Sequence, residues 1–126
     1  MKLDFNSKLP IYHQISEMIK EAILNADLSA GDPIPSVREM SVNYGINPQT
    51  ILNATALLIN ENVIEKKRGV GMFVSDSAKQ ILIEEEMKTF KSRQIPFIIN
   101  RGEILGFNRK EICELIRKTG KGKKHE

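Results

Sequence analysis

The chain has 126 residues, of which 40% are apolar and 28% are charged. This composition is typical of a globular protein and excludes disordered, collagen-like and low-complexity classes. Nineteen basic and sixteen acidic residues give a net charge of +3. Residues 1–75 hold 7 basic and 8 acidic residues (net −1), whereas residues 76–126 hold 12 and 8 (net +4). A nucleic-acid function must therefore depend on local basic clusters, because the overall charge is small.

The sequence gives no indication of a membrane segment, a metal site or a catalytic site. It has no apolar run near the roughly 18 residues that span a bilayer, and no secretory signal. The single Cys113 permits no internal disulfide, and His13 and His125 lie too far apart to suggest a metal site. Glycine-rich phosphate loops, nucleophile elbows and paired catalytic carboxylates are also missing from the sequence. We therefore expect a cytoplasmic protein that is not an enzyme and needs no cofactor.

The first predicted helix spans about residues 10–25. Its apolar residues follow the spacing of one face of an amphipathic helix, at positions 11, 15, 18, 19, 22 and 23. Pro10 suits the first turn, because a helix leaves that backbone N–H unpaired. Asp, Ser, Gly and Pro then dominate residues 25–35, so we expect a loop there.

Two short helices with a tight turn between them are predicted next. Ser36 and Glu39 have the spacing of a capping box, which begins a helix that ends near Gly45. Asn47-Pro48 matches the cap and first position of another helix, which continues to about residue 60. Two helices joined across three residues that include a glycine are typical of a helix-turn-helix.

A β-hairpin is predicted directly after these helices. Two β-prone runs, residues 63–67 and 72–74, flank a connection that contains Gly69 and Gly71. A helix-turn-helix followed by a hairpin with a basic tip is a winged helix. The expected fold is therefore mostly α with a small β-hairpin, and the winged helix-turn-helix domain should cover residues 8–76.

The composition changes after Ser75, and a helical segment over residues 77–118 is predicted. Pro96 must kink or restart a helix, because it removes one N–H and crowds the preceding turn. Cys113 is interpreted as a small core residue of the last helix. The basic tail, residues 119–126, is expected to be disordered. The segment has more apolar residues than it can bury on itself, which predicts a homodimer; the notable ones are Ile81, Leu82, Phe90, Phe97, Ile98, Phe107, Leu115 and Ile116.

Four blocks of residues 9–74 occur in an order that is typical of one protein family. They are Pro10–Ile15 (PIYHQI), Pro35–Met40 (PSVREM), Gly45–Thr50 (GINPQT) and Arg68–Val74 (RGVGMFV). Together they resemble the GntR family of bacterial transcription regulators. The short helical segment after the wing, with Asn47-Pro48, resembles the YtrA subfamily, whose C-terminal helices dimerise.

The resemblance implies a dimeric DNA-binding regulator. It suggests a repressor that binds a palindromic operator and controls a transporter-type operon including its own gene. An unidentified small-molecule effector at the dimer interface is left open. Leu52 and Asn53 stand where many members have an arginine. This departure leaves a second interpretation open, a winged helix that binds another protein and no specific DNA sequence.

Candidate DNA contacts lie around the predicted helix-turn-helix. Arg38 follows the Ser36 cap, where its guanidinium can grip a phosphate or a guanine edge; the alternative is a surface ion pair. The first turn of a recognition helix points at base edges. There Gln49 can pair with adenine, and Thr50 can bond a phosphate or touch a thymine methyl. Asn47 either caps the helix only or also contacts DNA.

The predicted hairpin supplies the remaining candidates. Lys66, Lys67 and Arg68 form either a solvated charge run or a contact with phosphates or the minor groove. The two nearby glycines permit close approach of the backbone to DNA, which favours the second interpretation. The full set of expected DNA-contact residues is Ser36, Arg38, Asn47, Gln49, Thr50, Asn53, Lys66, Lys67, Arg68, Gly69 and Gly71.

Overall fold

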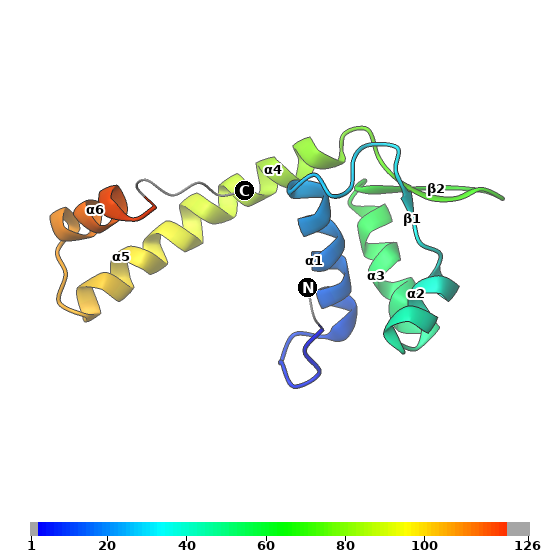
Figure 1. Cartoon of the computed structure of the whole chain (residues 1–126), viewed down its shortest axis with the longest axis horizontal. Helices are drawn as coiled ribbons and strands as arrows, with labels where there is room; N and C mark the ends of the chain where they lie inside the picture. The colour runs from blue at the N-terminus through cyan, green and yellow to red at the C-terminus, as the bar shows by residue number, and fades with distance from the viewer. Residues whose placement is uncertain (1–2, 121–126) are drawn as a thin grey trace. The chain divides into compact units, whose positions relative to one another are not determined.

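The computed structural model describes residues 3–120, which form two compact units that divide between Glu84 and Glu85. The first unit contains α1 (Ile11–Leu24), β1 (Pro33–Ile34), α2 (Val37–Tyr44), α3 (Pro48–Asn60), β2 (Ile64–Lys67), β3 (Gly71–Val74) and the start of α4 (Ala78–Thr89) (Figure 1). The second contains the end of α4, the π-helical segment η1 (Phe90–Gln94), α5 (Ile95–Ile104) and α6 (Arg109–Lys118). The predicted fold class, mostly helical with a small β-structure, is confirmed.

The core of the first unit lies where α1 packs against α3. The two helices lie side by side (Figure 1), and each contributes apolar residues one helical turn apart. These residues are fully or almost fully buried: Ile15, Ile19 and Ile23 from α1, and Ile51, Ala54 and Leu58 from α3. Two ion pairs of Lys20 in α1, with Glu17 in the same helix (3.6 Å) and with Glu61 after α3 (3.0 Å), add to this packing.

The helix-turn-helix has the caps that the sequence predicts. Ser36 Oγ accepts from the Glu39 backbone N–H at 3.0 Å, and Glu39 Oε1 accepts from the Ser36 N–H at 2.9 Å. Gly45 ends α2 with a φ of +65°, a conformation that costs glycine little. Asn47 Oδ1 then accepts from the Gln49 N–H at 2.7 Å and begins α3. The start of α3, which carries the candidate base contacts, is thus fixed by local hydrogen bonds.

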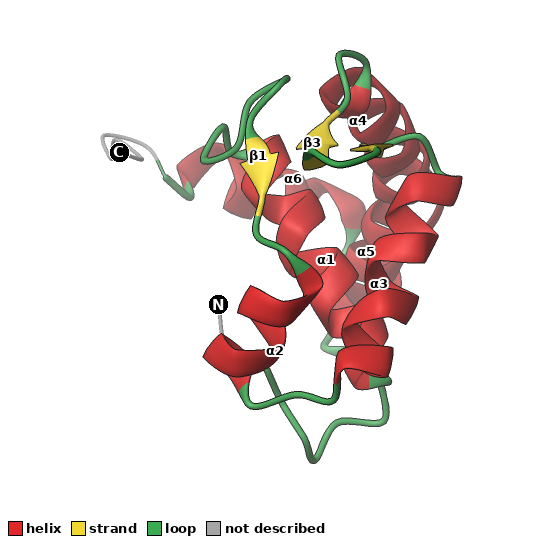
Figure 2. Cartoon of the chain, turned by 90° about the vertical axis from the view of Figure 1, so that its right-hand side faces the viewer, coloured by secondary structure: helices red, strands yellow, loops and turns green. Residues whose placement is uncertain are grey.

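The sheet has three strands where a two-stranded hairpin was predicted. Its order is β1-β3-β2, all antiparallel, with Pro33 opposite Phe73 and Ile34 opposite Met72. Figure 2 labels the two paired strands β1 and β3, drawn in yellow. The prediction of a loop throughout residues 25–35 is therefore wrong at β1. A two-residue strand has no alternation to detect, and its pairing with β3 is a tertiary contact. Pro33 is tolerated because β1 is an edge strand.

The start of α4 belongs to the first unit. Ala78 and Leu82 are each 1% exposed and lie in the same core as the residues of α1 and α3. Leu82 was expected in the apolar surface of the C-terminal segment, and that expectation is wrong. The first unit extends past residue 76 because its core needs these two side chains.

The second unit is built on the contact between α5 and α6. A π-helical turn, η1, directly precedes α5, so the chain changes its hydrogen bonding just before Pro96, the predicted site of a kink. Asn108 and Glu111 form a second capping box at the start of α6. Ile112 is buried, but Cys113 is exposed, so its assignment as a core residue is wrong. Cys113 follows Ile112 by about 100° around the helix, which turns it away from α5.

Most of the tail that was expected to be disordered, residues 121–126, lies outside the described part.

The described second unit leaves many large apolar side chains exposed: Met87, Phe90, Phe97, Ile98, Ile104, Leu105, Phe107, Leu115 and Ile116.

Candidate nucleic-acid interface

Every expected DNA-contact residue lies in the first unit, on α2, on α3, at the N-terminal cap of one of these helices, or on the β2–β3 hairpin. All of them are exposed except Thr50, which is half-buried. These residues come from three segments of the chain, and the fold brings the three segments together in one unit. The geometry of each segment decides what its side chains can do.

The exposed face of α3 is entirely uncharged. The helix sequence, PQTILNATALLIN, contains no acidic or basic residue. Gln49, Leu52, Asn53 and Ala56 recur at the spacing of one helix face, and all are exposed. Such a face can offer hydrogen bonds and apolar contacts to base edges, whereas ionic contacts with phosphates must come from other elements.

Two of the predicted base-contact residues form a pair. Gln49 Nε2 donates a hydrogen bond to Asn53 Oδ1 at 3.0 Å along the exposed face of α3. This bond fixes the orientation of the Gln49 amide and leaves its Oε1 and second N–H for a ligand. This pair was not predicted, although the i, i+4 spacing of Gln and Asn in the sequence is a known signal for it.

The start of α2 presents a free cation. Among residues 3–120, Arg38 has no acidic partner, so the alternative of a surface ion pair is absent there. Arg38 is exposed and lies in the first turn of a helix whose N-terminal cap is made by Ser36. The Ser36 hydroxyl accepts the capping bond and keeps its own proton for a further acceptor.

The three basic side chains of the hairpin differ in their contacts. Lys67 Nζ lies 5.3 Å from the centre of the Phe73 ring, a cation–π contact that holds it over the sheet. Lys66 and Arg68 have no acidic partner within the described residues. Gly69 has a φ of +74° and Gly71 a φ of +129°, which shape the turn that carries Arg68.

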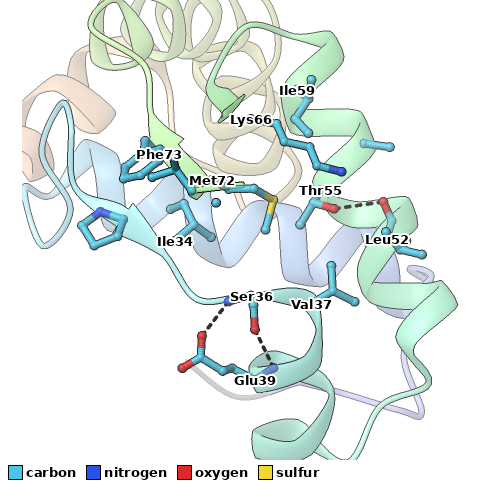
Figure 3. A pocket seen from close by; sticks show the side chains of 14 residues that line it. Ile34, Ser36, Val37, Glu39, Leu52, Thr55, Ile59, Lys66, Met72 and Phe73 are labelled. Atoms are coloured by element: carbon cyan, nitrogen blue, oxygen red, sulfur yellow. Dashed lines mark hydrogen bonds between the residues drawn. The ribbon is translucent and has the colours of Figure 1, made fainter. Parts of the chain in front are cut away.

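A groove of about 500 Å³ lies between α3, the start of α2 and the sheet. Figure 3 shows Leu52, Thr55 and Ile59 from α3 and Ile34, Met72 and Phe73 from the sheet, while the start of α2 supplies Ser36, Val37 and Glu39. Lys66 brings a positive charge and Glu39 a negative charge to this otherwise mainly apolar lining. The groove is therefore lined by α3 on one side and by the β2–β3 hairpin on another.

Comparison with known proteins decides the family. The family of "Bacterial regulatory proteins, gntR family" matches residues 11–74, a range that includes every candidate contact residue. The chain belongs to the GntR family. It is also similar to the HTH-type transcriptional repressor YtrA of Bacillus subtilis, with 37% identity over 79% of this chain and 77% of YtrA.

Two solved structures extend the comparison with GntR proteins. A GntR family transcriptional regulator from Listeria monocytogenes is 29% identical, with a TM-score of 0.75 over 91% of this chain and 99% of that chain. AraR(DBD), solved in complex with operator ORX1, is 26% identical, with a TM-score of 0.53 over 60% of this chain and 93% of that chain. The present chain is thus a DNA-binding transcription regulator of the GntR family, of the YtrA type. Within residues 3–120 it has no helix with the length and apolarity needed to span a membrane.

Proposed function

We propose that this GntR-family protein is a homodimeric repressor that binds a palindromic operator and controls a transporter-type operon including its own gene. The observation that carries the proposal is the arrangement of charge on the first unit. An uncharged α3 face is flanked by three cations that have no acidic partner in the described part of the chain, Arg38 on α2 and Lys66 and Arg68 on the hairpin. This division suits base edges at the helix and phosphates at its flanks.

Each candidate residue then has a role that its geometry permits. Gln49, oriented by Asn53, pairs with an adenine, and Thr50 contacts a phosphate or a thymine methyl. Ser36 and Asn47 keep their capping bonds while the Ser36 proton and the Asn47 amide protons donate to phosphates. The hairpin contributes its backbone at Gly69 and Gly71 and its charges at Lys66, Lys67 and Arg68.

The homodimer is proposed from the surface of the second unit. A hollow of about 550 Å³ between α5 and α6 is lined almost entirely by apolar side chains, including Phe97, Leu105 and Ile116. The side chain of Phe97 is 67% exposed. A second copy that covers this surface would remove it from water, with a gain of about 25 cal/mol per Å² of apolar area. A small-molecule effector, if one acts, would bind at the same interface.

The experiment measures binding of the full chain to the DNA upstream of its own gene as salt is varied. Arg68→Ala should weaken binding to all sequences and reduce the slope of log affinity against log salt by about 0.9 for each lost phosphate contact. Lys79→Ala, an exposed lysine of the first unit on α4, is the matched control and should leave the slope unchanged. If the wild-type chain binds this DNA no better than unrelated DNA, the proposed operator is wrong.

A further inference from the structure

Leu52 is a large apolar side chain on the exposed face of the recognition helix. It is 44% exposed and lies one turn from Gln49 and next to Asn53, the hydrogen-bonded amide pair. The core does not need it, because Ile51, Ala54 and Leu58 fill the buried face of α3 at 0% exposure. Leu52 is therefore free for a contact outside the chain.

The surroundings of Leu52 extend its apolar character. Leu52 and Val37 line the groove (Figure 3). Ala56 of α3 and Val70 of the hairpin belong to the same lining. Val70 is 69% exposed. The polar side chains of the lining are Ser36, Glu39, Thr55 and Lys66, so one carboxylate and one cation accompany the apolar residues. Arg38 on α2 and Arg68 on the hairpin are further exposed cations of the same unit, so apolar contacts with base edges can be combined with ionic contacts with phosphates.

The major groove of DNA displays one apolar group, the C5-methyl of thymine. We propose that Leu52 is a specificity-determining residue that contacts this methyl group in each half-site of the operator. The inference rests on the proposed operator binding and adds an apolar reader to the hydrogen-bonding pair Gln49 and Asn53. It predicts that the half-site contains a thymine whose methyl group, separately from its hydrogen-bonding groups, contributes to affinity.

Deoxyuridine tests this directly, because it differs from thymidine only by the missing methyl. The experiment uses the full chain and an operator selected from random duplexes, with each symmetric pair of thymines replaced in turn by deoxyuridine. One pair should lower wild-type affinity by about fourfold per half-site, the value for one buried methyl group. The Leu52→Ala protein should bind more weakly to the thymine operator and show no further loss with deoxyuridine at that pair.

A matched control is Val42→Ala, which shortens another exposed aliphatic side chain, 75% exposed on α2, that does not line the groove. It should keep the wild-type sensitivity to deoxyuridine. The inference is overturned if no deoxyuridine position lowers wild-type affinity, a result that needs no variant to fold. It is also overturned if Leu52→Ala keeps the full wild-type sensitivity. A wild-type chain that selects no sequence at all would instead contradict the proposed operator binding itself.

Discussion

Replacement of Gly102 by alanine tests the packing of α5 against α6, which shapes the proposed dimer surface. A Cβ atom at Gly102 would lie 2.5 Å from Ile112 Cδ1 and 3.1 Å from Ile112 Cγ1. Both distances are shorter than a normal van der Waals contact. The Ile112 side chain or the backbone at residue 102 must therefore move. Ile112 is the buried residue of α6, only 7% exposed, and its movement disturbs the contact between the helices.

Two opposing effects set the magnitude of this change. Alanine is favoured over glycine inside a helix by about 1 kcal/mol. Overpacking of a well-packed contact costs about 1–3 kcal/mol, and part of it is relieved here because Cδ1 is the end of a side chain. We expect Gly102→Ala to lower the free energy of unfolding by about 0–2 kcal/mol, with the overpacking term dominant.

The cause is separated from the helix propensity by a second substitution. Ile112→Val removes Cδ1, the atom of the 2.5 Å contact, at a cost of about 0.5–1.5 kcal/mol on its own. In that background Gly102→Ala should become neutral or stabilising, with a coupling of about 1–2 kcal/mol. Urea unfolding at one fixed protein concentration measures all four proteins. An equal effect of Gly102→Ala in both backgrounds would refute the packing argument.

Three further predictions test the first unit. Leu82→Ala should lower the free energy of unfolding by about 2–5 kcal/mol, whereas Ile83→Ala, at the exposed neighbouring position, should have little effect. Equal melting temperatures of the two variants would contradict the placement of Leu82 in the core. Ser36→Ala should cost about 1 kcal/mol through loss of the capping box, and an unchanged urea midpoint would show that the cap is dispensable. Gln49→Ala should weaken the free energy of operator binding by about 1–3 kcal/mol and relax the preference at one base pair. Asn53→Ala should relax the preference at the same base pair, because its side chain orients Gln49. Additive effects in a double-mutant cycle would show that the two residues act independently.

The helix boundaries of the first unit could be predicted because their signals are local. Ser36 with Glu39, Gly45 and Asn47-Pro48 each fix a helix end through bonds between near neighbours in the chain, and the structure has all of them. The winged-helix architecture could then be predicted from the order of these elements. Four sequence blocks in the right order made the family assignment possible in the same way.

The features that could not be predicted depend on contacts between distant residues. β1 exists only through its pairing with β3, 40 residues later in the sequence for Pro33 and Phe73. The apolar pattern of α4 does not reveal that Leu82 completes the core of the first unit. Cys113 was placed by residue type, but its exposure depends on which face of α6 meets Gly102. For the candidate site, the residues could be proposed from the sequence, and the i, i+4 spacing of Gln49 and Asn53 is a local signal for their hydrogen bond, which only the structure establishes.

Selection from a pool of random duplexes by the full chain tests the central claim most directly. Two copies of α3 related by two-fold symmetry should enrich a palindromic sequence, with half-sites spaced to place both helices on one face of the duplex. Within each half-site, Gln49 and Leu52 should select adenine and thymine at defined positions. Enrichment of such a palindrome by the wild-type chain, with loss of preference at one position for Gln49→Ala, is the predicted result. Enrichment of no sequence, or of one without two-fold symmetry, would contradict the account.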